Sequence, residues 1–566
     1  MSWTPYQAED YVDFDYVEHF CQRLAKTHPE WVDLEVVGES HQGRPLYLLT
    51  LSARQTDRVG CERGQRPALW LDAGTHATEW TGISAVLFTI SRWMEGLTGD
   101  DERLQRWFSE YEVLIMPCIS PDGVQAMHEG SAYIRSSLTP PPNEAVRSGL
   151  DPCDIDGDGA VRMMRWKHRA GTFVEDEDWA PFLRPRNLDD DPDDAYFLCT
   201  EGEFINWDGV RWTRAPAEFG TDLNRNFPGE WKPFSWDGRH AGPFALSEPE
   251  SRAVVDAFAN HPHIGCALTM HTYTGCILTQ PTRKDTPLSD GDIDMMQQLA
   301  TDVVADTGYQ VIKIYPDFMY HKDRPVGGSW ADTISAVFGV PGYTIELWDP
   351  IGYADVEVDN PLEFLMRPPP DKLQKMLQKF AENRDNFAPW RAFEHPQLGT
   401  IEIGGIEYLR TLRNPPPDRL AQECETALTM SDRARRALPK VQATVDVTAL
   451  GDNSHRVRLI LENQGFLPTN GLQRGVDIGA SPPVSATLNL SETLSVDEPR
   501  ERKLDHIDGW GNVRTGPARN AVYASLPTRG QHQFVDWTVH GTGTLQITWH
   551  AGRGGCSTEA IELGTP

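Results

Sequence analysis

The chain has 566 residues, a length that exceeds one ordinary hydrophobic core and predicts roughly two to four domains. Its formal net charge of −31 argues against nucleic acid as the main partner, because phosphates repel so acidic a surface. We interpret the acidity first as a means of solubility, with attraction of basic peptides as the alternative.

The cysteines and the amino terminus bear on the cellular compartment. The nine cysteines are scattered and form no Cys-x-x-Cys pair, which favours a reducing compartment over a disulfide framework. The first residues lack the basic start and apolar run of a secretory signal, and no apolar stretch reaches the roughly 18 residues that span a bilayer. We therefore expect a cytoplasmic protein without a membrane segment.

Apolar strands alternate with amphipathic helices over residues 1–395. Such alternation predicts an α/β domain whose mixed, twisted sheet carries helices on both faces. We expect helices at 11–28, 80–97, 248–260 and 293–307, and strands at 32–37, 46–51, 68–72, 113–118, 266–270 and 343–347.

Residues 131–219 interrupt this alternation. They contain Pro140-Pro141-Pro142 and two acidic runs, at 175–178 and 189–194. We interpret them as an insertion in the α/β domain that is ordered in part.

The character of the chain changes after residue 395. A connecting segment at 396–440 is expected to hold one helix, at 419–438. From 441 to 566, short alternating segments separated by Gly and Pro turns predict an antiparallel, β-sandwich-like accessory domain. Its expected strands are 441–447, 456–461, 486–490, 534–539 and 544–550.

Two metal-ligand side chains stand three residues apart in His76-Ala77-Thr78-Glu79-Trp80, directly after a predicted strand. Zinc sites in enzymes use three such donors and keep a fourth position open for water. His271 ends an apolar strand, where α/β sheets place ligands, and is the preferred third donor. His261 and His263 are rivals, but they lie in a predicted loop.

Three further residues predict a reaction at this site. Asn224 and Arg225 place an amide beside a guanidinium, a fork that can hold a carboxylate. Glu346 is a carboxylate in an otherwise apolar strand, where burial without a partner is costly. It could act as the general base that takes a proton from metal-bound water, although a salt bridge to a helix would also satisfy it.

Four segments together resemble the zinc carboxypeptidases of the carboxypeptidase A type. They occur in the family order and are His76-Ala77-Thr78-Glu79-Trp80, Asp222-Leu223-Asn224-Arg225-Asn226, Met270-His271-Thr272-Tyr273 and Thr344-Ile345-Glu346-Leu347. The resemblance covers residues 10–385, with a large insertion. The C-terminal part resembles, more weakly, the accessory β-domain of some bacterial members.

The resemblance implies a role for each matching residue. His76, Glu79 and His271 would hold one zinc ion, Asn224 and Arg225 would bind the substrate's terminal carboxylate, and Glu346 would activate water. The family also uses an arginine to stabilise the oxyanion, and Arg165 is the preferred candidate over its neighbours Arg162 and Arg169.

Two positions depart from the family pattern. Thr78 stands where the family often has an arginine before the glutamate ligand. The substrate-capping tyrosine should lie just before Gly327-Gly328, but the aligned residues are 321–325. Either Tyr320, a few residues early, takes this role or no residue does.

The run Asp154-Ile155-Asp156-Gly157-Asp158-Gly159 matches the start of a calcium loop. The twelfth position is Arg165 and not the glutamate of an EF-hand, so a complete EF-hand is not expected. A single Ca²⁺ bound by Asp154, Asp156 and Asp158, which would order the insertion, and a solvated turn both remain open.

The expected function is that of a zinc metallocarboxypeptidase, a protease that hydrolyses the C-terminal bond of peptides or proteins. One alternative is a zinc amidase or cell-wall peptide hydrolase of the same fold. Another is a non-enzymatic binding module with a vestigial metal site. The sequence indicates neither the oligomeric state nor the preferred terminal residue.

Overall fold

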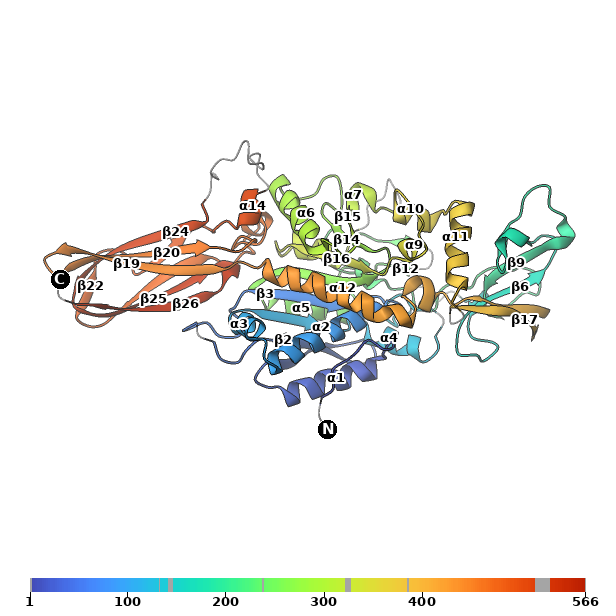
Figure 1. Cartoon of the computed structure of the whole chain (residues 1–566), viewed down its shortest axis with the longest axis horizontal. Coiled ribbons are helices and arrows are strands. Elements are labelled where there is room, and N and C mark those ends of the chain that lie inside the picture. Colours follow the sequence, from blue (N-terminus) through green and yellow to red (C-terminus); the bar gives the residue numbers. More distant parts are fainter. Residues whose placement is uncertain are drawn as a thin grey trace.

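The computed structural model of the chain describes residues 3–56, 58–131, 133–140, 146–236, 239–320, 327–383, 386–514 and 530–564. Three parts follow one another along its longest axis: a C-terminal pair of sheets, a central α/β body, and a sheet built largely from the insertion (Figure 1). The two outer parts lie at opposite ends of the body (Figure 1).

The central body is built on an eight-stranded mixed sheet, as predicted. Its inner strands β4, β3, β13 and β16 run parallel, whereas β1, β2 and β14 have antiparallel neighbours. The spatial order is β1 (Val32–Glu39), β2 (Pro45–Leu51), β4 (Glu112–Met116), β3 (Ala68–Ala73), β13 (Ile264–Thr272), β16 (Gly342–Leu347), β14 (Cys276–Thr279) and β15 (Gln310–Lys313).

Helices cover both faces of this sheet. Because side chains alternate along a strand, Leu69 and Leu71 of β3 join one core cluster and Trp70 joins the other. The first cluster lies under α1 (Phe14–Thr27), α2 (Trp80–Thr98), α3 (Glu102–Glu110), α4 (Pro121–His128), α6 (Asp290–Val304) and α12 (Pro417–Arg436). The second lies under α5 (Pro249–Ala259) and α8 (Trp330–Ala336).

Four short helices follow the sheet strands in the second half of the body. Residues of α9, α10 and α11 share a smaller cluster that includes Phe364 and Phe380. These helices are α7 (Ile314–Asp317), α9 (Pro350–Tyr353), α10 (Pro361–Met366) and α11 (Pro370–Ala381).

The insertion forms most of a second, six-stranded sheet. Its order is β17 (Phe387–His395), β18 (Gly399–Ile406), β6 (Met163–Lys167), β9 (Ala195–Thr200), β7 (Phe173–Glu175) and β8 (Leu183–Pro185). Two separate pairs of strands are β5 (Gly149–Pro152) with β10 (Gly202–Ile205), which shares a core cluster with β6 and β18, and β11 (Ser235–Trp236) with β12 (Arg239–His240).

The expected connecting segment at 396–440 packs differently from a linker. Strand β18 lies between β17 and β6 inside the insertion sheet. Helix α12 places Leu420, Cys424 and Met430 in the main core, beside α2. The segment therefore contributes to the central body, because its apolar stripe is buried there.

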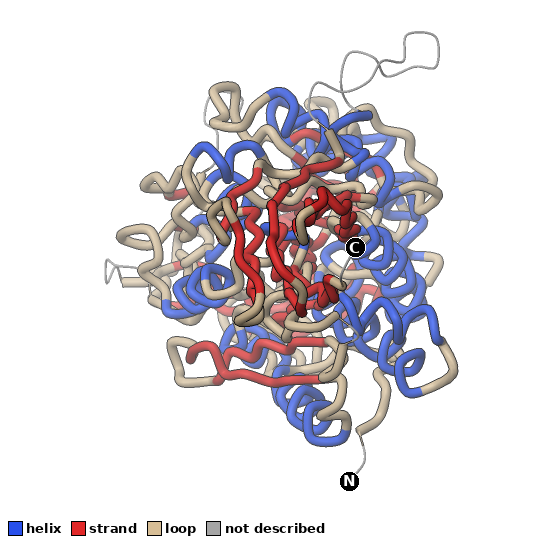
Figure 2. The backbone as a smooth tube through the Cα atoms, turned by 90° about the vertical axis from the view of Figure 1, so that its left-hand side faces the viewer, coloured by secondary structure: helices blue, strands red, loops and turns tan. Residues whose placement is uncertain are grey.

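Two four-stranded antiparallel sheets close the chain as a sandwich, which confirms the predicted fold of this part. They are β19 (Val441–Gly451), β20 (Ser454–Asn463), β24 (His532–Gly541) and β22 (Leu494–Val496), and β23 (Glu501–Leu504), β21 (Val484–Leu490), β25 (Gly543–Ala551) and β26 (Cys556–Leu563). Trp537 and Trp549 fill the core between them. Viewed from this end, the strands of the sandwich stand in front of the helices of the body (Figure 2).

Two short helices, α13 (Gln473–Asp477) and α14 (Trp510–Arg514), complete this region. Within the described ranges, none of the helices combines the length and apolarity that crossing a bilayer requires.

Candidate metal and active site

The candidate metal ligands meet at the carboxyl ends of neighbouring parallel strands. His76 and Glu79 lie in the loop between β3 and α2, and His271 lies near the end of β13. His271 and Glu346 of β16 are register partners. The preceding residues on the two strands, Met270 and Ile345, belong to the core cluster that lies under α1 and α2. Because side chains alternate along a strand, His271 and Glu346 point to the opposite face of the sheet. Strand parity therefore places these two side chains on one face.

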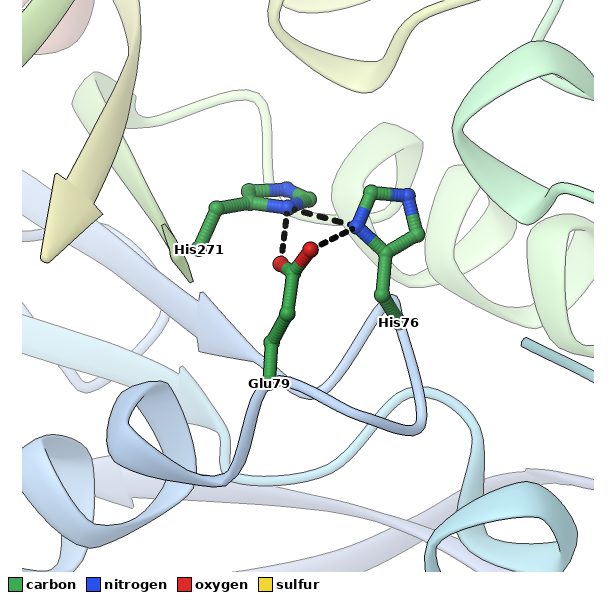
Figure 3. Close-up of side chains that lie close together, drawn as sticks. All are labelled: His76, Glu79 and His271. Carbon is green, nitrogen blue, oxygen red and sulfur yellow. Dashed lines mark hydrogen bonds and ion pairs between the residues drawn. The ribbon is translucent and has the colours of Figure 1, made fainter. Parts of the chain in front are cut away.

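The three donor side chains converge on one point (Figure 3). Glu79 Oε1 lies 2.8 Å from His76 Nδ1, and Glu79 Oε2 lies 2.9 Å from His271 Nδ1. The two ring nitrogens are 3.1 Å apart. At most 3% of the surface of each residue is exposed. Two imidazole nitrogens and a carboxylate are the His₂Glu set that binds catalytic zinc.

Asp222 sets the orientation of His76. Its Oδ1 lies 3.3 Å from His76 Nε2, while its Oδ2 accepts a hydrogen bond from Arg135 Nε at 3.0 Å. Burial opposes ionisation, but the Arg135 guanidinium holds the pKa of Asp222 well below its usual range. With Nε2–H donated to this carboxylate, the lone pair of His76 Nδ1 faces Glu79 and His271. A lone pair and a carboxylate directed at one point fit a bound cation.

A cavity of about 360 Å³, here called the metal pocket, joins these donors to the predicted carboxylate fork. His76, Glu79, Asn224, Arg225 and Glu346 all line it. The Asn224 side-chain oxygen accepts from the backbone N–H of Trp330 at 2.9 Å, which leaves its amide N–H groups for another acceptor. The described residues offer no partner to the buried Nε of Arg225. Asn224 and Arg225 can therefore donate hydrogen bonds to a carboxylate bound in the metal pocket.

The surroundings of Glu346 raise its pKa, which suits a general acid–base group. Burial raises its pKa, and the negative charge of Glu79 acts in the same direction. A cation among the donors would oppose both effects. The carboxyl group can thus change its protonation state in response to what the pocket holds.

The structure does not bring Arg165 to the metal pocket. Arg165 faces away from Trp166 on β6 because side chains alternate along a strand. Its guanidinium instead binds Glu402 at 2.8 Å and Glu175 at 3.1 Å and lies over the ring of Trp390. This corrects the prediction that Arg165 would stand beside the metal donors.

Two arginines that the sequence analysis missed line the metal pocket. Arg135 lies 3.5 Å from Glu79 Oε1, and Arg413 Nη1 lies 3.3 Å from the same oxygen. A usable signal existed for Arg135, the only charged residue between Glu129 and Glu144. Arg413 carried none, because it lies more than 300 residues after Glu79 in the chain.

The remaining candidates fall in different places. Tyr320 lines the metal pocket and is 37% exposed, whereas the aligned residues 321–325 lie outside the described ranges. His263 lies 3.3 Å from Glu112, and neither it nor His261 joins the three donors.

The carboxylates of Asp154, Asp156 and Asp158 lie close enough to share an ion. Backbone amides of the same loop and the guanidinium of Arg391 already contact them. Calcium at this loop stays a prediction.

Comparisons with known proteins agree with the geometry. A family model described as zinc carboxypeptidase matches residues 17–172 and 197–383, more than half of the chain. Carboxypeptidase B of Astacus astacus is 31% identical over 123 residues, which are 22% of this chain and 35% of that protein. Human carboxypeptidase A6 is 22% identical over 284 residues, which are 49% of this chain and 46% of its own length. The chain therefore belongs to the zinc carboxypeptidase family.

The other findings concern coverage and fold. The chain spans about a third to a half of the length of these curated relatives. The solved carboxypeptidase A of Helicoverpa armigera aligns with a TM-score of 0.40 at 17% identity, over 68% of this chain and 76% of that one. A second family model, a domain of unknown function, matches residues 441–562.

Proposed function

We propose that the protein is a zinc-dependent carboxypeptidase that releases the last residue of a peptide with a free C-terminus. One observation carries the proposal: two members of a buried His₂Glu donor set, His76 and Glu79, line the same cavity as the carboxylate fork and the acidic side chain of Glu346. Family membership and the complete donor set favour this function over a binding module with a vestigial site.

The residues of the chain divide the work. When bound by His76, Glu79 and His271, Zn²⁺ supplies Lewis acidity and lowers the pKa of a coordinated water. Asn224 and Arg225 hold the terminal carboxylate, so that only the final peptide bond reaches the donors. Glu346 accepts the proton of the attacking water and returns it to the departing amine.

Arg135 supplies positive charge where the oxyanion develops. Its Nε is held by Asp222, which leaves the rest of the guanidinium toward the pocket. A preorganised donor of this kind contributes about 3 to 4 kcal/mol to transition-state stabilisation in other enzymes.

The proposal is tested with pairs of peptides that differ only at the C-terminus. We expect hydrolysis of the free acid and none of the amidated peptide, with activity lost on chelation and restored by Zn²⁺. Glu346→Gln should keep its zinc and lose the activity. Equal cleavage of amidated and free peptides would support the amidase alternative, and a zinc-loaded wild type that cleaves neither would refute the proposal.

A further inference from the structure

A second cavity adjoins the metal pocket. It has a volume of about 470 Å³, and the insertion supplies most of its wall. Arg239 and Tyr408 line both cavities. Arg239 also donates a hydrogen bond to the hydroxyl of Tyr133, another residue of the second cavity, at 3.4 Å. The two spaces thus meet at these shared side chains.

The wall of this second cavity is aromatic. Trp166 of β6 and Phe197 of β9 are cross-strand neighbours with ring centroids 5.3 Å apart, and Trp212 packs against both at 5.7 and 4.9 Å. Leu150 and Phe204 add further apolar surface. We call this cavity, lined by Trp166, Phe197, Trp212, Leu150 and Phe204, the aromatic pocket.

The aromatic pocket is built to receive an apolar group. Trp212 remains 37% exposed although it lies among other aromatic rings. The described lining of the aromatic pocket contains arginines but no acidic residue, in a chain whose net charge is −31. Concave aromatic surface left in contact with water favours a ligand that covers it.

The position of the pocket indicates which group that is. The fork fixes the last residue of a substrate in the metal pocket, whose 360 Å³ holds only the end of a peptide. The chain before the cleaved bond must leave that pocket, each residue extending the path by at most about 3.3 to 3.6 Å. The adjoining space past Tyr408 and Arg239 is the aromatic pocket.

We propose that the aromatic pocket binds an aromatic or large aliphatic side chain of the substrate, a few residues before the cleaved bond. The inference rests on the proposed carboxypeptidase function and deepens it. It makes the enzyme selective for peptides with an apolar residue upstream of their end, beyond whatever the metal pocket selects at the last residue.

The test uses blocked peptides that share the same final two residues and carry either tryptophan or alanine at one of the four preceding positions. For the wild type we expect kcat/KM to be roughly tenfold or more higher with tryptophan at one of these positions. A blocked dipeptide, too short to leave the metal pocket, serves as the reference substrate.

Trp212→Ala should abolish this preference and leave dipeptide hydrolysis unchanged, because Trp212 is absent from the lining of the metal pocket. Phe197→Leu provides a second variant with a milder loss of aromatic surface. Trp510→Ala, which removes a 41% exposed tryptophan near the sandwich, is the matched control and should keep the preference.

The outcomes separate the two proposals. Dipeptide cleavage without any positional preference, or a preference that survives in both Trp212→Ala and Phe197→Leu, would overturn the assignment of the aromatic pocket alone. Failure of the zinc-loaded wild type to cleave the dipeptide would overturn the proposed function itself.

Discussion

At the scale of single residues, charges buried around the donors decide what the site can do. Asp222 contacts both His76 and Arg135, so one carboxylate orients a candidate metal ligand and a candidate oxyanion donor. Arg413 approaches Glu79 from a segment that the zinc carboxypeptidase model does not match. Arg413 therefore lines the metal pocket although it lies outside residues 17–383, the range that the family model spans.

The two candidate oxyanion arginines can be separated by substitution. Arg135→Gln should lower kcat by about 10²- to 10³-fold, because a preorganised charge next to the reacting carbonyl is lost. Arg165→Gln should leave kcat unchanged and lower the free energy of unfolding by only about 1 kcal/mol, since its partners Glu175 and Glu402 are partly exposed. Steady-state kinetics and urea unfolding of both variants measure this, and a large kcat loss confined to Arg165→Gln would restore the original assignment.

A buried acid that does not line the metal pocket should make stability depend on pH. Burial raises the pKa of Glu250 to about 7, and the described residues offer no partner to its Oε2. The folded state therefore holds a proton between pH 4.5 and 7 that the unfolded state has released, and the contribution to stability is lost as pH rises through that window.

Glu250→Gln removes this titration while keeping an acceptor for the His41 amide. Relative to wild type, the variant should gain about 3 kcal/mol of unfolding free energy between pH 4.5 and 8. Denaturant titrations of both proteins at a series of pH values give the difference. Parallel pH curves for the two would show that Glu250 titrates alike in the folded and unfolded states.

At the scale of elements, the start of α2 depends on a residue distant in sequence. Its first residues follow Glu79, yet no side chain of the helix itself caps them. Asn414 supplies the missing acceptor: its Oδ1 accepts from the Thr81 amide at 3.0 Å, and its Nδ2 donates to the Thr78 carbonyl at 2.8 Å. The segment before α12 thereby holds in place the loop between β3 and α2 that contains His76 and Glu79, here called the metal loop.

Asn414→Ala should therefore affect both stability and zinc binding. We expect a loss of about 2 kcal/mol in unfolding free energy, because buried groups lose their partners, and weaker zinc retention during dialysis against a chelator. Ser289→Ala removes the cap of α6, which bonds the Asp292 amide at 3.1 Å, and should cost about 1 kcal/mol without changing zinc retention. Equal zinc retention in all three proteins would contradict a role for Asn414 at the metal loop.

At the scale of the whole molecule, one buried guanidinium joins the sandwich to the central body. Arg553 follows β25 and donates to the carbonyls of Pro262, Ile264 and Phe338 at 2.6 to 2.9 Å. Only 2% of its surface is exposed. Three acceptors of the body thus depend on a single residue of the sandwich.

Arg553→Met should uncouple the two parts. The variant leaves buried carbonyls without donors, and we expect a loss on the order of 3 kcal/mol together with a broadened or two-step unfolding transition. Arg458→Met, which breaks a partly exposed pair with Asp536 within the sandwich, should cost less than about 1 kcal/mol. Calorimetry of both variants reports the difference, and equal small losses would show that the junction does not depend on Arg553.

Sequence alone determined what is local in this protein. The strand and helix periods predicted the mixed sheet and the sandwich, and short motifs placed His76, Glu79, Asn224 and Arg225 because neighbours in the chain remain neighbours in space. His271 and Glu346 were within reach for a related reason, since strand ends of one sheet share an edge.

Only the tertiary structure decided which arginines enter the metal pocket, that α12 belongs to the central body, and that the insertion builds an aromatic cavity beside the donors. Each of these depends on contacts between segments tens to hundreds of residues apart. No periodicity or motif records such contacts, because packing of the complete chain determines which side chains are brought together and whether a charge such as Arg165 finds its carboxylates elsewhere.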